Sequence, residues 1–378
     1  MKKIVVLLLL SSISLFAFSQ SSYFTVYGKV ISSQNKLPLQ GASVFAQNTT
    51  LGTATDADGN FKLRLPDGGY NLVITFTGYN IESRRINNAE ALDKNLFFEL
   101  NQKEKEMADV AVVSSSEVKD GWDKYGSFFL DKFIGQTTNS TLCILKNKDA
   151  VKFYFSKKRN RLKVLATEPL LLENQALGYT IKYSLDSFTH EYNTQVSLYT
   201  GYPLFEEMQP TDAAQQLKWA TARQHAYLGS MLHFMRSLYN KTLKEEGFEV
   251  QFVVDINEKE TTIPLKDFYG AFNYAKNDST SLVEVKPNQL RVGVIYVKEK
   301  PAQKFINFYP DEPAGFQFST LTFLPNESIG IEQNGYYFEQ NDIAISAYWT
   351  WDKMADQLPY NYNVSTVQKV EAVENAQR

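Results

Sequence analysis

The chain contains a single cysteine, Cys143, among its 378 residues. One thiol cannot form an internal disulfide, so the fold must be stabilised by its hydrophobic core. Cys143 lies within an apolar, strand-like run, and the nearest histidine in the sequence is the distant His190. A catalytic thiol needs a base or a positive charge beside it. We therefore expect Cys143 to be a buried core residue.

Histidine is almost as scarce, with only His190, His225 and His233 in the chain. A zinc carboxypeptidase site needs a His-x-x-Glu pair and a distant histidine as ligands, and no Glu stands three positions after any of these histidines. A Gly-x-Ser-x-Gly elbow, a phosphate-binding loop and a dinucleotide-binding fingerprint are also missing from the sequence. The sequence therefore predicts no metal site, no cofactor and no enzymatic activity.

One segment, 56–60, resembles the start of a calcium-binding loop. Such a loop has Gly at its sixth position and Glu at its twelfth, but these positions hold Phe61 and Asp67. We expect a tight hairpin turn here instead, in which an Asp-Gly pair joins strands at 52–55 and 60–65.

An excess of basic residues is also absent. Lys and Arg number 39 against 42 Asp and Glu, which gives a formal net charge of -3 at pH 7. Without a basic block, nucleic acid is not an expected partner. After residue 19, no apolar stretch approaches the ~20 continuous residues of a membrane helix. The mature chain is therefore not expected to span a membrane.

The first 19 residues have the pattern of a cleaved signal peptide. Lys2 and Lys3 precede an apolar segment, and Ala17-Phe18-Ser19 provides a cleavage site before Gln20. A membrane anchor is the alternative, but Ser11, Ser12 and Ser14 interrupt the apolar run and no charged flank follows it. The sequence therefore predicts export.

Residues 22–100 predict a small β-sandwich. Apolar and polar residues alternate in four sets that begin at Phe24, Phe61, Leu72 and Leu96, and Pro- or Gly-containing turns separate them. Short strands with a turn every eight to twelve residues are typical of a sandwich of about seven strands. The enrichment in aromatic residues, 14% of the chain, also favours strands.

Four segments of this region resemble the carboxypeptidase regulatory-like domain. They are Gly28-Lys29-Val30, the Pro-Leu-x-Gly-Ala element in 37–44, the Thr-Asp-x-Asp-Gly-x-Phe element in 52–61, and Gly78-Tyr79. The resemblance implies a transthyretin-like, seven-stranded β-sandwich, and we expect this sandwich to serve as an interaction module.

Residues 101–119 are largely polar and are predicted to be a linker, with one short strand at 110–113. Residues 120–361 are predicted to form a larger β-rich domain, and residues 362–378 a disordered tail. Within the larger domain, 211–246 has helical periodicity and predicts one long helix, or a helix pair hinged near Gly229. A short closing helix is expected at 351–358. The expected fold class is thus mainly β, and α+β overall.

The larger domain also has a weaker resemblance to known proteins. The segments 172–179, 226–230 with His233-Phe234, and 348–351 resemble exported Bacteroidetes proteins. In those proteins, a regulatory-like sandwich precedes a second domain of unknown role. The resemblance implies a location in the periplasm or at the outer membrane.

Six residues are the candidate binding residues of this domain. On one continuous helix, Lys218, His225, His233 and Arg236 would share an arc beside Gly229, where an anion or a sugar could approach. An ordinary solvated helix face is the alternative. Trp349 and Trp351 could stack on carbohydrate, although aromatic residues beside strands usually pack into the core.

These observations favour an exported, non-catalytic binding or structural protein of the cell envelope. Its partner would be an envelope protein or a glycan. The alternative is a glycan-handling protein that binds or hydrolyses carbohydrate with the second domain. Hydrolysis would need two carboxylates held roughly 5–10 Å apart, and the sequence alone cannot select such a pair among 42 acidic residues.

Overall fold

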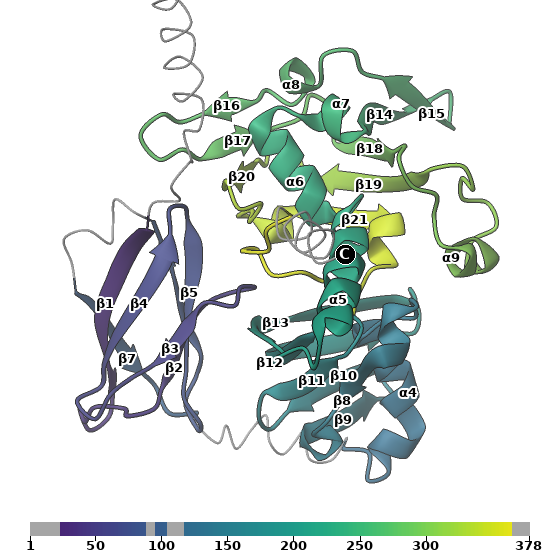
Figure 1. Cartoon of the computed structure of the whole chain (residues 1–378). Helices are drawn as coiled ribbons and strands as arrows, with labels where there is room; N and C mark the ends of the chain where they lie inside the picture. The colour runs from purple at the N-terminus through teal and green to yellow at the C-terminus, as the bar shows by residue number, and fades with distance from the viewer. Residues whose placement is uncertain (1–22, 88–94, 104–116, 365–378) are drawn as a thin grey trace, which may run out of the picture.

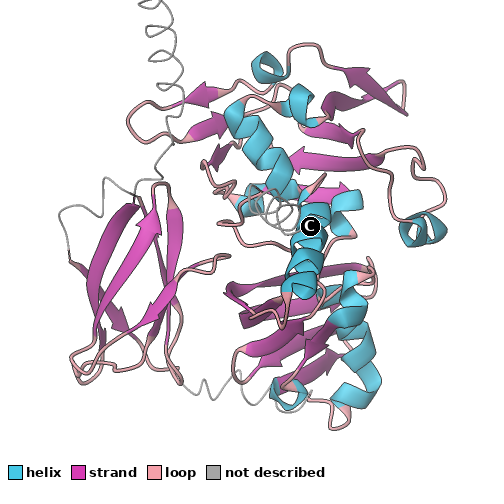
Figure 2. Cartoon of the chain, viewed as in Figure 1, coloured by secondary structure: helices cyan, strands magenta, loops and turns pink. Residues whose placement is uncertain are grey.

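The computed structural model describes residues 23–87, 95–103 and 117–364. The predicted signal peptide, the strand at 110–113, most of the linker and most of the tail lie outside these ranges. Within them, the chain forms an N-terminal sandwich and two further β-sheet regions, each with its own hydrophobic cluster (Figure 1). Strands predominate over helices (Figure 2). The expectation of a mainly β, α+β chain is confirmed.

The N-terminal part is a β-sandwich of seven strands, as predicted. One sheet has the strand order β4-β1-β7 and the other has the order β3-β2-β5-β6. Alternate residues of β4 and β7 point into the shared core, where Val30, Leu65 and Leu72 have no exposed surface. The strands are β1 (Tyr23–Ser32), β2 (Ser43–Ala46), β3 (Gly52–Ala54), β4 (Asn60–Pro66), β5 (Tyr70–Thr75), β6 (Glu82–Ile86) and β7 (Leu96–Leu100).

The predicted hairpin between 52–55 and 60–65 is wrong, because β3 pairs with β2 whereas β4 pairs with β1. The turn between them instead passes from one sheet to the other. Asp56 Oδ1 accepts hydrogen bonds from the backbone N–H groups of Asp58 and Asn60. Gly59 has φ +75° and its carbonyl accepts from the N–H of Val30. Strand β4 therefore pairs with β1 and does not form the predicted hairpin with β3.

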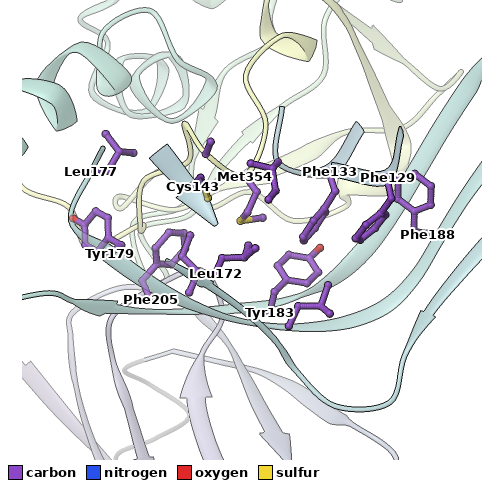
Figure 3. Close-up of a cluster of buried hydrophobic side chains, with 14 of the residues drawn as sticks. Phe129, Phe133, Cys143, Leu172, Leu177, Tyr179, Tyr183, Phe188, Phe205 and Met354 are labelled. Atoms are coloured by element: carbon purple, nitrogen blue, oxygen red, sulfur yellow. The ribbon is translucent and has the colours of Figure 1, made fainter. Parts of the chain in front are cut away.

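The first sheet of the second part has six strands, with the order β8-β11-β12-β10-β9 and with β13 paired to β12. Helix α4 (Gly121–Phe133), which the sequence analysis did not predict, inserts Phe129 and Phe133 into the core of this sheet (Figure 3). The strands are β8 (Cys143–Leu145), β9 (Val151–Ser156), β10 (Arg161–Ala166), β11 (Leu170–Asn174), β12 (Tyr179–Glu191) and β13 (Val196–Glu207).

Cys143 belongs to this core and is 8% exposed, which confirms a buried thiol. Burial raises the pKa of the Cys143 thiol to about 12, with a smaller contribution from the charge of Asp356.

The second sheet has the order β15-β14-β18-β19-β21, and a smaller sheet has the order β16-β17-β20. Their strands are β14 (Phe248–Ile256), β15 (Lys259–Pro264), β16 (Ala275–Lys276), β17 (Val283–Val285), β18 (Arg291–Tyr296), β19 (Gln317–Phe323), β20 (Ile329–Ile331) and β21 (Ile343–Ala347). The helices of this region are α6 (Met231–Asn240), α7 (Leu243–Glu246), α8 (Phe268–Ala271) and α9 (Gln303–Phe308). Short 3₁₀ helices occupy Asn139–Leu142, Lys148–Ala150, Gln340–Asp342 and Tyr348–Thr350.

The predicted helical segment is a helix pair, not one long helix. Helix α5 (Ala213–Tyr227) begins at Asp212, whose side chain accepts a hydrogen bond from the N–H of Gln215. Gly229 breaks the helix with φ +75°, and Ser230 then caps α6. The left-handed Gly247, with φ +92°, ends α7.

The closing helix expected at 351–358 is absent. The backbone N–H groups of Met354 and Ala355 donate instead to the carbonyls of Phe133 and Ile134 at the end of α4. The segment is thus anchored to another element and makes no helical ladder of its own. Met354, Ala355 and Leu358 complete the core of the first sheet, although the preceding Trp349 belongs to the core of the second.

The sandwich is joined to the second part through its β2–β3 turn. The N–H of Asn48 donates to the Pro203 carbonyl, and the Thr49 carbonyl accepts from the N–H of Phe205. The carbonyl of Asn48 accepts from Tyr360. Backbone bonds of this kind fix the turn against β13 and the C-terminal segment. Among the described residues, no helix is both long enough and apolar enough to span a membrane.

Candidate binding cleft

The predicted arc of basic residues does not form one exposed surface, because the break at Gly229 ends the helix on which it was drawn. Lys218 and His225 are exposed on α5. His225 lies 3.5 Å from the carboxylate of Glu299. His233 lies on α6 and is only 2% exposed. The structure therefore separates the residues that a continuous helix would have aligned.

His233 instead holds the junction of α5 and α6. Its Nδ1 accepts a hydrogen bond of 3.1 Å from the N–H of Gly229, which leaves the ring proton on Nε2. Nε2 lies 3.2 Å from Glu246 Oε2, to which it donates. Burial lowers the pKa of His233 to about 4, although Glu246 opposes this shift.

Arg236 is also engaged by the fold. Its Nε donates to the carbonyl of Asn334 and its Nη2 to the carbonyl of Tyr360, each at 2.9 Å. The guanidinium also lies 5.5 Å from the ring centre of Tyr227. Two backbone carbonyls thus orient this side chain, and it links α6 to the C-terminal segment.

Trp349 and Trp351 are each 8% exposed, so neither presents a ring face on which a sugar could stack. Trp349 Nε1 donates to the carbonyl of Gly229 at 2.8 Å, and its ring packs on Phe234. Trp351 packs on Phe305. Around Gly229 the structure does bring together two of the six candidates, His233 and Trp349, but they support the core.

A polar cleft of about 530 Å³ lies where the sandwich meets the second part, and we call it the junction cleft. This volume falls within the range of small-molecule sites, roughly 300–1,000 Å³. The sandwich contributes one wall, β12 and β13 a second, and the loop 336–342 a third. The lining side chains include Gln47, Asn71, Arg85, Asp186, Tyr202 and Phe338.

Amide side chains connect two of these walls. Asn71 Nδ2 donates to Gln47 Oε1 at 2.8 Å, and Gln47 Nε2 donates to the carbonyl of Gly201 at 3.3 Å. Because Gly201 belongs to β13, this chain of hydrogen bonds crosses from the sandwich to the second part. It fixes the width of the cleft at this end.

Arg85 connects the sandwich to the wall formed by the loop 336–342 and to the neighbouring Glu332. Its guanidinium lies 3.6 Å from the ring centre of Phe338, and Nη2 lies 3.3 Å from Glu332 Oε1. Glu332 is 3% exposed. Burial raises the pKa of its carboxyl, while Arg85 and the N–H of Gly69 act in the opposite direction. Arg85 thus provides the charge that the buried carboxylate requires.

The remaining charges of the cleft are acidic. Asp186, which accepts a hydrogen bond from Thr200 Oγ1 at 2.9 Å, lines it with Glu339 and Asp342. Tyr202 lies among them, and burial raises the pKa of its hydroxyl. With three acids against Arg85, the cleft suits a neutral ligand with hydroxyl and amide groups better than an anion.

A smaller cavity of about 180 Å³ adjoins the cleft, since Asn48 and Gln357 line both. Asp352 and Asp356 also line this cavity. Asp356 accepts hydrogen bonds from Thr137 Oγ1 and Asn139 Nδ2. Burial raises the pKa of both carboxyls, and the charge of Asp356 raises that of Asp352 further. One carboxylic acid and one carboxylate can therefore share this cavity near neutral pH.

In the part of the chain that the structure describes, no group of three or more His, Cys, Asp or Glu residues is arranged to hold a metal ion. The Asp-rich turn at 56–60 uses Asp56 Oδ1 to accept backbone N–H groups. The junction cleft was missed by the sequence analysis because its walls come from three separate parts of the chain. The only local signal was the clustering of Tyr, Asn and Gln at 336–342.

Comparison with protein families identifies the sandwich. Residues 26–112 match the CarboxypepD_reg-like domain family, so the chain carries a CarboxypepD_reg-like domain in its N-terminal part. No curated protein matches the chain.

Solved structures provide only distant similarities. A mutant type II cohesin–X-dockerin complex from Acetivibrio cellulolyticus is 28% identical over 20% of this chain, with a TM-score of 0.16. This chain spans about half of that one, 51%. A DUF3823 family protein from Bacteroides ovatus is 11% identical, with a TM-score of 0.17 over 51% of this chain and 84% of its own. Because both TM-scores are below 0.5, neither similarity carries an argument about fold or function.

Proposed function

We propose that the chain is an exported, non-catalytic binding protein of the cell envelope, located in the periplasm or associated with the outer membrane. In this proposal the sandwich is an interaction module of the transthyretin-like type, and the partner is an envelope protein or a glycan. The N-terminal sequence pattern supports export.

One observation supports the binding role most directly. The junction cleft has walls from both the sandwich and the second part, and the amide side chain of Gln47 connects them by donating to the Gly201 carbonyl. Because these walls are fixed to each other, a ligand would meet a preformed site and would lose less entropy on binding. The amide, tyrosine and carboxylate groups of the junction cleft suit a short polar chain, such as an oligosaccharide or the loop of a partner protein.

Binding can be measured by isothermal titration calorimetry with a panel of neutral oligosaccharides and uncharged peptides. For any ligand found, Asp186→Ala and Tyr202→Ala should each weaken the affinity about tenfold or more, because they remove a lining acceptor and a lining ring. A matched control is Lys158→Ala, an exposed side chain in the β9–β10 turn. Affinities that both cleft variants leave unchanged would place the ligand elsewhere and contradict the proposal.

Glycan hydrolysis is the second candidate function, and the pair Asp352 and Asp356 favours it. Glycan hydrolysis uses one protonated and one ionised carboxyl, and the larger upward shift in the pKa of Asp352 allows it to hold the proton while Asp356 is ionised. Release of reducing ends from the same oligosaccharides should then be lost in Asp356→Asn. Binding without any release of reducing ends would exclude hydrolysis of those glycans and leave the binding role.

A further inference from the structure

The outward side of the three-stranded sheet β4-β1-β7 combines aromatic and basic side chains. On β1, Phe24 and Val26 point into the core, and Tyr23 and Tyr27 point outward with 50% and 47% of their surface exposed. Phe97 on β7 is 47% exposed as well. Large aromatic side chains are therefore displayed on this surface although the sandwich has a complete core elsewhere.

Basic side chains lie between these rings because of the strand register. Tyr27 is opposite Lys62 on β4, and Lys29 is opposite Phe97 on β7. Arg64 lies 4.3 Å from the ring centre of Tyr23, and Lys62 lies 5.6 Å from that of Tyr27. We call this surface the outer sandwich face, and it consists of Tyr23, Tyr27, Lys29, Lys62, Arg64 and Phe97.

The positive charge of this face is not neutralised within the described ranges of the chain. There, none of Lys29, Lys62 and Arg64 is within ion-pair distance of a carboxylate. The acid on the same face, Glu99, is held by Lys36 at 2.7 Å. Tyrosine rings orient two of the three cations and leave guanidinium and ammonium hydrogens for a partner.

The second part of the chain does not use this face. The hydrogen bonds and the ion pair that connect it to the sandwich involve residues 47–50, Gly69, Tyr70, Ser83 and Arg85, none of which belongs to the outer sandwich face. In Figure 1, β1 and β4 lie on the side of the sandwich away from β12 and β13. The face and the junction cleft are therefore separate surfaces with opposite charge.

The dimensions of the face favour a narrow partner. At about 3.3 Å per residue and 4.8 Å between strands, it measures roughly 20 Å by 15 Å. That is on the order of 300 Å², well below the ~800 Å² per partner of a stable protein–protein interface. A single polysaccharide chain is narrow enough to lie along such a strip, and its repeated units offer the face many equivalent places to bind.

We propose that the outer sandwich face binds an anionic polysaccharide that carries carboxylate groups. The carboxylates would pair with Lys29, Lys62 and Arg64, and the C–H faces of the sugar rings would pack on Tyr27 and Phe97. This inference does not depend on the ligand of the junction cleft.

Binding of the purified full chain to polygalacturonate, measured by affinity electrophoresis at low and moderate salt, tests the proposal. The double variant Lys62→Gln/Arg64→Gln should weaken binding at least tenfold, and Tyr27→Ala about threefold or more. The matched control Lys157→Gln/Lys158→Gln removes the same charge from the exposed β9–β10 turn and should change binding less than twofold. Neutral dextran should not be retained.

Two results would overturn the proposal. Equal weakening by the control variant would show that net charge alone retains the polymer. Equal binding of polyglutamate, with no effect of Tyr27→Ala, would indicate an acidic polypeptide as the partner. Circular dichroism of each variant confirms that the sandwich remains folded, so that loss of binding reports on the face.

Discussion

The backbone N–H of Gly229 donates to Nδ1 of His233 at 3.1 Å, so the residue that breaks the α5–α6 helix is bonded to a side chain of the helix that follows. Trp349 Nε1 bonds to the carbonyl of the same glycine at 2.8 Å. Both polar groups of Gly229 are thus satisfied by side chains within the protein. The break between the helices is therefore a fixed corner of the fold.

Protonation of His233 should destabilise this corner. The pKa of His233 is lowered to about 4 by burial, below the ~6.5 of an unfolded chain. Between these pH values the unfolded state binds the additional proton, so the free energy of unfolding falls as the pH falls from about 6.5 to about 4. From the difference between these two pKa values, we expect the loss to be on the order of 2–3 kcal/mol. Urea unfolding of the wild type and of His233→Gln across this range measures it.

In His233→Gln the decline over this pH range should be smaller, because the side chain no longer titrates. His225→Gln is the matched control, since His225 is an exposed histidine on α5. If the control flattens the pH dependence as much as His233→Gln does, the buried histidine is not its cause.

The Arg85–Glu332 pair predicts a coupling between the sandwich and the second part. Arg85→Met would leave the buried Glu332 carboxylate without its counter-charge, and should lower the free energy of unfolding by about 1–3 kcal/mol at pH 8. Because burial raises the pKa of Glu332, the loss should shrink as the pH falls and the carboxyl becomes neutral.

Adding Glu332→Gln to Arg85→Met removes the buried charge and should recover most of the loss at pH 8. Thermal unfolding of the two single variants and the double variant gives the coupling as a double-mutant cycle. Additive effects of the two substitutions would argue against the ion pair.

The stability that neutral Asp352 contributes should be complete below about pH 3.9, the ordinary pKa of an unfolded Asp, and should decrease as the pH rises from there towards its raised pKa in the folded state. Its pKa is raised well above the ordinary value, first by burial and then by the charge of Asp356. The folded state therefore holds the proton more tightly, and the stability from the neutral form is lost as the pH rises. Asp352→Asn should raise the melting temperature at pH 8 and have little effect at pH 4.

The exposed Asp149 provides the control for this experiment, because Asp149→Asn changes the same charge in contact with solvent. A melting temperature that rises equally in both variants, or at both pH values, would contradict the assignment to the buried carboxyl.

Cys143 should be almost unreactive in the folded protein. Burial raises its pKa to about 12, so the thiolate is scarce at pH 8 and the reagent cannot reach the sulfur. We expect a disulfide reagent such as DTNB to react at least a hundredfold more slowly with the native chain than with the chain in urea. Rapid labelling of the native protein would show that the core around Cys143 opens readily.

The sandwich could be predicted from sequence because strands such as β4 and β7 have one buried and one exposed face. Alternation such as Phe61, Leu63 and Leu65 with polar residues between them identifies a strand directly. Which strands pair is a different matter, since the Asp-Gly turn at 58–59 is local but the choice between β1 and β3 as the partner of β4 is not. The predicted β3–β4 hairpin is wrong because strand pairing depends on residues far apart in the sequence.

The sequence of helix α4 (Gly121–Phe133) carries a weak helical pattern. Trp122, Tyr125 and Phe129 have helical spacing, but Gly121 and Gly126 weaken the pattern. In the structure a side chain at Gly121 would collide with Phe153, so this glycine allows close packing of the helix on β9.

The candidate site could not be predicted in the same way. The helical arc required one unbroken helix, and the break at Gly229 removed it. The junction cleft needs the relative position of Asn71, Gly201 and Phe338, which only the tertiary fold establishes. Each continuous segment of the sequence contributes only a few of the residues that line the cleft.

The crossing of the C-terminal segment between two cores has a consequence for biosynthesis. Met354, Ala355 and Leu358 fill the core of a sheet whose strands were completed by residue 207, and Tyr360 bonds to the sandwich. A ribosome therefore releases β8–β13 long before the side chains that close their core exist. Until residue 358 has been made, that sheet lacks part of its core and exposes apolar surface of the kind that holding chaperones bind.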